Sequence, residues 1–140
     1  MRLLVHFIVS LALVMLLYPF YKEQALLIFI GGFLIDIDHY LWYMFRFKDF
    51  NLKKALEYYK KLDFKDVLIL FHTIEFVVVV FLLSLYPGLG LLFVGYIIHI
   101  IMDTIYMYKC NILGLRAFSL ILWIKRRIDK RARGKIKPLA

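Results

Sequence analysis

The chain has little of what builds a disulfide-bonded or nucleotide-binding protein. Cys110 is its one cysteine, which excludes a disulfide framework and a paired-cysteine metal knuckle and leaves a buried or lipid-facing thiol as the expectation. The GGF sequence at 31–33 is not a phosphate-binding loop, because no strand precedes it and no Lys-Ser or Lys-Thr pair follows it. Close helix packing is therefore the expected role of these glycines.

Acidic residues are also scarce, with 10 Asp and Glu against 19 Lys and Arg and a net charge of +9. A basic balance can indicate a nucleic-acid partner, but no aromatic interleaving or groove-reading element accompanies the charge here. We therefore expect no nucleic acid. The positions of the basic residues point instead to a membrane surface.

The chain is rich in apolar residues, which make up 64% of its 140 residues. Four apolar runs stand out, at about 3–18, 24–45, 66–86 and 88–108. A bilayer core requires about 20 residues per helix, and the first run, although short, has Tyr18 and Phe20 as interfacial anchors. It ends in YPFYKE rather than in a small-residue cleavage site, so we expect a retained helix and not a signal peptide. The pattern predicts an all-α membrane protein, a four-helix transmembrane bundle with interfacial amphipathic helices.

The basic residues predict the topology of these helices. With both termini inside, 18 of the 19 Lys and Arg residues lie on the inner side and only Lys22 lies outside. This distribution predicts a multi-pass protein of the cell membrane with cytoplasmic N- and C-termini. Its expected partners are membrane lipid and the anionic headgroups of the cytoplasmic face.

Two further segments are predicted to lie on the membrane. In FNLKKALEYYKKLDF, residues 50–64, an apolar face of Leu52, Leu56, Tyr59 and Leu62 opposes the lysines. The segment from Ile112 contains only about 13 apolar residues and is too short to span. It is expected to be re-entrant or interfacial, with a basic end that either binds lipid headgroups or anchors the chain. We therefore divide the chain into a metal-binding transmembrane domain, 1–118, and an interfacial helix with a basic cytoplasmic tail, 119–140.

The two halves of the bundle also suggest an internal repeat. His6 leads to Tyr18-Pro19 and Gly32, as His72 leads to Tyr86-Pro87 and Gly95. The two hairpins would then be parallel copies about an axis along the membrane normal. Chance similarity between two apolar hairpins is the alternative.

Eight ionisable side chains fall within the four runs, and each charge at the centre of a bilayer costs roughly 3 kcal/mol. They are His6, Asp36, Asp38, His39, His72, Glu75, His99 and Asp103. At about 1.5 Å per residue, those with estimated depths lie roughly 6 to 13 Å from the inner ends of their helices. Residues that only pack helices together would not be expected to share one level, so a common site is predicted.

The local spacings are those of metal ligands. His99 and Asp103 are i and i+4, while His72 and Glu75, like Asp36 and His39, are i and i+3, so each pair shares a helix face. Asp38 points elsewhere on an unbroken helix, so either Gly31-Gly32 loosens the helix or Asp38 orients a histidine. Four carboxylates would balance two divalent cations, which favours a binuclear site. Mixed imidazole and carboxylate ligands favour zinc, with manganese or iron as alternatives.

Two motifs carry a resemblance to a known family. GYIIHIIMD, residues 95–103, and IDIDH, residues 35–39, resemble the GYxxHxxxD and PDxDH motifs of the YdjM-type membrane-bound metal-dependent hydrolases. That family is itself similar to the zinc-dependent phospholipase C and single-strand nuclease superfamily. The resemblance extends from His6 to about residue 118. It departs at Ile35, which replaces the proline, and at LFHTIEF, which lacks the arginine and first histidine of the family's HRGxTHS.

The resemblance implies a metal-ligand set and candidates for catalysis. The implied ligands are Asp36, Asp38, His39, His72, His99 and Asp103, and Glu75 and His6 complete the predicted set. The candidates for catalysis are Asp36, Asp38, His72 and Glu75, and which of them is the general base is left open.

Three functions are compatible with such a site. The first is a metal-dependent hydrolase acting on a phosphoester such as a lipid headgroup, with Arg46, Lys109 or Arg116 steadying the anion. The second is a transporter or proton relay. Against it, the outer half of the bundle is almost wholly apolar, with Ser10 and Ser84 as its polar residues. The third is a non-catalytic, metal-stabilised membrane protein.

Overall fold

The computed structural model describes residues 3–61, 67–113 and 116–132. Within these residues the chain is helical apart from turns, loops and an isolated bridge between Val67 and Arg116, which confirms the prediction of an all-α protein. The helices are α1 (Leu3–Tyr21), α2 (Leu26–Gly32), α3 (Ile37–Phe47), α4 (Leu52–Lys60), α5 (Ile74–Ser84), α6 (Gly90–Lys109) and α7 (Leu120–Ala132). Three short 3-10 turns are η1 (Lys22–Ala25), η2 (Leu34–Asp36) and η3 (Leu70–His72). Leu62 of the predicted interfacial helix and the tail 133–140 lie outside the described residues.

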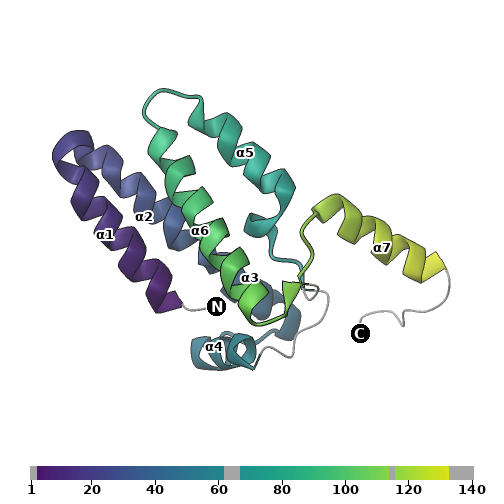
Figure 1. Ribbon diagram of the computed structural model, residues 1–140. Helices are drawn as coiled ribbons and strands as arrows, with labels where there is room; N and C mark the ends of the chain where they lie inside the picture. The colour runs from purple at the N-terminus through teal and green to yellow at the C-terminus, as the bar shows by residue number, and fades with distance from the viewer. Residues whose placement is uncertain (1–2, 62–66, 114–115, 133–140) are drawn as a thin grey trace.

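The helices α1, α2, α6 and α5 stand side by side, with α2 between α1 and α6 (Figure 1). Helices α2 and α6 cross at close range because a glycine of each helix lies against the backbone of the other. A Cβ added at Gly31 would collide with the carbonyl oxygen of Leu92, and one added at Gly95 would collide with that of Ile28. Small residues allow helix backbones to approach in this way. The packing role predicted for the GGF glycines is therefore confirmed at Gly31.

The second apolar run, predicted as a span over 24–45, is not one unbroken helix. It is broken by η2, where Phe33 has φ −130° and ψ −48° and ends α2. The alternative in which Gly31-Gly32 loosens this helix is therefore the one observed, because the two glycines, which have low helix propensity, immediately precede the break. Helix α3 then restarts at Ile37 in a new direction, which changes where the following acidic residues point.

The third apolar run is also shorter as a helix than predicted. Helix α5 has 11 residues, about 16 Å at 1.5 Å per residue, against a hydrocarbon core of about 30 Å. It starts where it does because Thr73 is extended and its side chain accepts a hydrogen bond from the Phe76 N–H at 3.4 Å. Earlier in this run, Val67 forms a bridge with Arg116 instead, and its carbonyl accepts from the Ala117 N–H at 3.1 Å. The predicted helix over 66–86 was therefore wrong in its first third.

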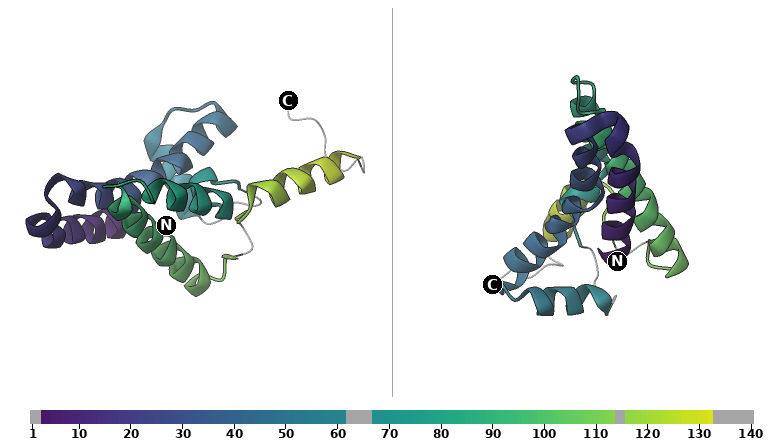
Figure 2. Two further views of the ribbon diagram at one scale, coloured as in Figure 1. Left: turned by 90° about the horizontal axis from the view of Figure 1, so that it is seen from above. Right: turned by 90° about the vertical axis from the view of Figure 1, so that its left-hand side faces the viewer.

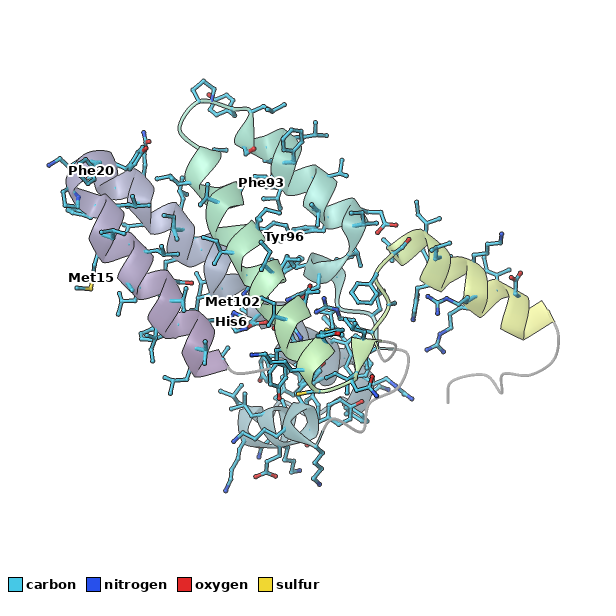
Figure 3. All side chains as sticks on the ribbon, viewed as in Figure 1. His6, Met15, Phe20, Phe93, Tyr96 and Met102 are labelled. Carbon is cyan, nitrogen blue, oxygen red and sulfur yellow. The ribbon has the colours of Figure 1, made fainter. Side chains whose placement is uncertain are left out.

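Two helical runs, Leu3–Phe47 and α6, are long and apolar enough to cross a membrane. The outward faces of the bundle are apolar, and Leu4, Met15 and Leu16 are each more than 60% exposed. Figure 3 shows Met15 and Phe20 pointing away from the bundle. The structure thus shows an all-α protein with two candidate spans, and a four-helix transmembrane bundle remains a proposal.

Helices α4 and α7 lie apart from this bundle. Helix α4 packs Ala55 and Tyr59 against Tyr43 of α3, and its N-terminus is capped by Asn51, which accepts from the Lys54 N–H. The Lys54 ammonium also donates to Asp49 at 3.0 Å, and this hydrogen bond lowers the pKa of the Asp49 carboxyl. Helix α7 projects away from the other helices (Figures 1 and 2). Its apolar residues Ile121, Leu122, Ile124 and Ile128 are exposed.

Candidate metal centre

Seven of the eight predicted ionisable residues meet in one cluster inside the bundle. Each of the seven is at most 7% exposed, and they are His6, Asp36, Asp38, His39, His72, His99 and Asp103. They come from α1, the η2–α3 segment, η3 and α6. Figure 3 shows His6 near the level of Met102, toward the end where α1 begins and α6 ends. The seven residues are therefore brought together in space, as a common site requires.

Asp36 lies at the centre of the cluster. Its Oδ1 is 3.3 Å from His39 Nδ1, 3.5 Å from His99 Nε2 and 3.7 Å from His72 Nε2. Neither of its carboxylate oxygens has a hydrogen-bond partner among the described residues. Asp36 precedes α3, but its side chain does not cap that helix. A buried carboxylate that no donor satisfies, surrounded by imidazole nitrogens, is the arrangement expected of a metal ligand.

Asp38 has a different task, because it orients the imidazoles on either side. Its Oδ2 accepts from the Phe71 N–H at 2.8 Å and lies 3.2 Å from His72 Nδ1. Its Oδ1 lies 3.0 Å from His39 Nδ1. Since a carboxylate oxygen accepts, His72 carries its proton on Nδ1 and leaves the lone pair on Nε2 facing the cluster. The break at η2 brings Asp38 to this position, and its contacts with His72 and His39 agree with the interpretation that it serves as partner to a histidine.

A hydrogen bond to the backbone fixes His99 in the same tautomer as His72, with the proton on Nδ1. Its Nδ1 donates to the Gly32 carbonyl at 2.9 Å, and this carbonyl is free because α2 ends there. The Nε2 atoms of His72 and His99 then face each other at 2.9 Å. Two nitrogens whose protons are both held elsewhere cannot hydrogen-bond each other, so their lone pairs converge on one point. A cation between them would satisfy both.

Asp103 completes the cluster on the side of α1. Its Oδ1 lies 3.2 Å from His6 Nε2, and its Oδ2 lies 3.5 Å from His72 Nε2 and accepts from the Arg116 guanidinium at 3.1 Å. Arg116 is 7% exposed. This buried pairing was not predicted, because Arg116 was placed at the membrane edge as an anion-binding candidate. The one available signal was an arginine alone among apolar residues.

The residues present fit a divalent cation. Two overlapping sets have ligand atoms all within 4.8 Å of one another, namely Asp36, His39, His72 and Asp103, and His6, Asp36 and His99. Three carboxylates against one guanidinium leave two negative charges uncompensated when the imidazoles are neutral. Burying them alone would be costly, and a divalent cation would balance them. Imidazole and carboxylate together suit zinc, manganese or iron.

Glu75 does not join the cluster. Its carboxylate accepts from the Ser119 hydroxyl at 2.6 Å and from the backbone N–H groups of Leu120 and Ile121 at 3.0 and 3.3 Å. These contacts place Glu75 at the N-terminus of α7, where a negative charge is favourable. The structure thus assigns the carboxylate a structural task, and its predicted roles as ligand and in catalysis have no geometric support.

Other residues near the site take three different positions. Arg46 is exposed and lies over the Phe47 ring at 5.8 Å. Lys109 lies beside His6 on the wall of a cavity. Tyr59, predicted only as part of the apolar face of α4, donates its hydroxyl to the His39 carbonyl at 3.0 Å and packs edge-on against the His39 ring. Tyr59 therefore helps to position His39, a contact that the sequence pattern did not predict.

Two cavities reach the cluster. One of about 320 Å³ lies against α3 and α4 and has Asp36 and His39 in its wall. The other, of about 370 Å³, lies between α1 and α6 and reaches His6, with Lys109 also in its wall. Residues of the cluster thus line two cavities, although the side chains of the cluster are buried. Structural metal sites, in contrast, are closed.

The fold and the cluster together define a class, an all-helical, apolar-surfaced protein with an internal His/Asp constellation of metal-binding type. Comparisons with known protein families, curated proteins and solved structures found no match for the chain.

Proposed function

We propose that this protein is an integral membrane hydrolase that holds a divalent metal ion in the His/Asp cluster and cleaves a phosphoester at the cytoplasmic face. The observation that carries the proposal is that Asp36, whose carboxylate oxygens are buried and unsatisfied, and His39 are among the residues that line an open cavity. A buried site of ligands that a substrate can reach is what catalysis needs and what a purely structural site lacks. The resemblance to the YdjM-type hydrolases points the same way.

The cluster residues would hold the metal, with zinc as the first candidate and manganese or iron as alternatives. Asp36 belongs to both ligand sets, so the cluster could hold two ions with Asp36 among the ligands of each. The charge balance supports one ion, because Glu75 lies elsewhere and Arg116 neutralises one of the three aspartates. Measuring the number of metal ions bound per chain would therefore distinguish the one-ion arrangement from the two-ion arrangement.

The chemistry is hydrolysis of a P–O ester bond. Water supplies the hydroxyl group that ends on phosphorus and the proton that ends on the departing alcohol. When bound, a divalent cation supplies Lewis-acid activation of that water and stabilises charge on the phosphoryl oxygens. Asp38 keeps the His72 lone pair directed inward, while Arg116 and Lys109 place positive charge at the cluster and in the cavity beside His6.

Membrane insertion is supported by the distribution of polarity. The polar cluster is inside and the exposed faces of α1 are apolar, the reverse of a water-soluble protein. The basic residues 46–61 lie near the cluster end of the bundle, as a cytoplasmic orientation of both termini requires. In this arrangement α4 and α7 are interfacial helices, and anionic headgroups are their partners.

A transporter is the less favoured alternative. Among the described residues, buried polar groups stop at Ser10, and the bundle beyond it is filled by Val14, Ala25 and Ile28. A continuous conduit would need polar side chains there. Ion flux through the protein in proteoliposomes would favour this alternative.

The proposal is tested with purified protein loaded with zinc or manganese and a panel of soluble and lipid phosphoesters. We expect cleavage of at least one class, reduced at least 100-fold in Asp36→Asn and unchanged in Asp49→Asn. Asp49 is a matched control because it is a carboxylate outside the cluster, bound to Lys54. Stoichiometric metal with no cleavage of any substrate would contradict the hydrolase and leave a non-catalytic metal site.

A further inference from the structure

The cavity beside Asp36 and His39 has an apolar wall with a polar end. We define the α3–α4 groove by its apolar residues Leu3, Phe33, Leu34, Ile37, Leu52 and Leu56. The other residues of its lining include Asp36, His39 and Tyr40, and the carboxylate oxygens of Asp36 are themselves buried. A groove of this kind orients an amphiphile, because its apolar part lies along the wall and its polar part reaches the ligands.

The groove exists because of two local features of the chain. The break at η2 turns α3 away from α2, and α4 then packs back onto α3 through Tyr59 and Tyr43. Leu34, Ile37 and Leu52 are left about half exposed along the opening. In the proposed orientation this opening lies at the depth where α4 meets the inner leaflet, so a lipid chain can enter from the side without crossing water.

We infer that the substrate is a single-chain lipid phosphoester, whose alkyl or prenyl chain lies in the α3–α4 groove and whose phosphate reaches the His/Asp cluster. This inference rests on the proposed function and names its substrate class.

The size of the groove is suited to one chain. A methylene group is about as large as a water molecule, whose share of liquid volume is about 30 Å³. The cavity of about 320 Å³ therefore holds on the order of ten methylenes. Burying each methylene contributes about 0.8 kcal/mol, so chain length should control affinity strongly.

The groove is tested by filling it. Leu56→Trp adds volume at a half-buried position in the wall, and Ile101→Trp is the matched control on an exposed face of α6. The first probe is dodecyl phosphate carrying a photoreactive diazirine near the end of its chain, with cross-links mapped by mass spectrometry. We expect labelling of Leu52, Leu56 or Leu34 in the natural chain, reduced at least fivefold in Leu56→Trp and retained in Ile101→Trp. Labelling spread evenly over the exposed faces of α1 and α6 would overturn the inference.

Activity separates this inference from the proposed function. Leu56→Trp should slow cleavage of a dodecyl phosphoester at least tenfold more than it slows cleavage of p-nitrophenyl phosphate, with the same metal content as the natural chain. Equal loss on both substrates, or on neither, would contradict the groove while leaving the hydrolase intact. Mapped labelling of the groove in a protein that cleaves nothing would support the binding site and contradict the hydrolase.

Discussion

Replacing Asp38 with asparagine should weaken metal binding without abolishing it. Asp38 accepts from three groups, the Phe71 N–H and the Nδ1 atoms of His72 and His39, at 2.8, 3.2 and 3.0 Å. An asparagine has one oxygen, so it can serve Phe71 and His72 only if its NH₂ group faces His39. His39 would then have to move its proton from Nδ1 to Nε2 or turn its ring. Partners of this kind are worth about 10- to 100-fold in metal affinity, which corresponds to about 1.4 to 2.7 kcal/mol.

The assay is competition between the purified protein and a metal-binding dye for zinc, in detergent and at fixed pH. Asp38→Asn should show the 10- to 100-fold loss, Asp36→Asn a larger loss, and Asp49→Asn none. Unchanged affinity in Asp38→Asn would refute the orienting role. A loss as complete as that of Asp36→Asn would show instead that Asp38 is itself a ligand.

Three further perturbations test other parts of the structure. Gly31→Ala should lower the free energy of unfolding by about 1–3 kcal/mol, because its Cβ would strike the Leu92 carbonyl. Gly90→Ala is the control and should not lower it, because a Cβ there would meet nothing within 4 Å. Equal melting temperatures of the two variants would contradict the close crossing of α2 and α6. Glu75→Gln should speed hydrogen exchange in the first turn of α7 and leave the metal content unchanged, because the Glu75 carboxylate binds Ser119 and the α7 backbone. Loss of metal from the folded variant would show instead that Glu75 is a metal ligand. Chelation with EDTA should lower the melting temperature of the natural chain and not that of Asp36→Ala, because a ligand that binds only the folded state stabilises it.

The cluster was largely predictable from sequence because ionisable residues in apolar helices are costly unless they contact one another. His99 and Asp103 share a face of one regular helix, and α6 is regular over both positions. His6 needed only its depth, since α1 is also unbroken there. Helical periodicity predicts reliably which residues share a face where the helix is continuous, and these three residues lie in continuous helices.

The residues whose contacts the sequence pattern did not predict lie next to breaks in the helices or in connecting segments. His72 and Glu75 share a face only if one helix contains both, but Thr73 is extended and Glu75 turns toward α7. Asp38 seemed to point elsewhere for the same reason, because its position depends on the turn at η2. The pairing of Arg116 with Asp103 depends on the bridge from Val67, a contact between distant segments that no local pattern records.

The most direct test of the account is the metal content of the purified natural chain beside Asp36→Ala and His99→Ala, with Asp49→Ala as control and circular dichroism to check the helical content of each. We predict at least one divalent metal ion per natural chain and per Asp49→Ala chain, and loss of metal from both cluster variants with their helices retained. Equal metal content in all four proteins, or none in the natural chain after incubation with zinc, manganese and iron, would contradict the claim that the cluster is a metal site.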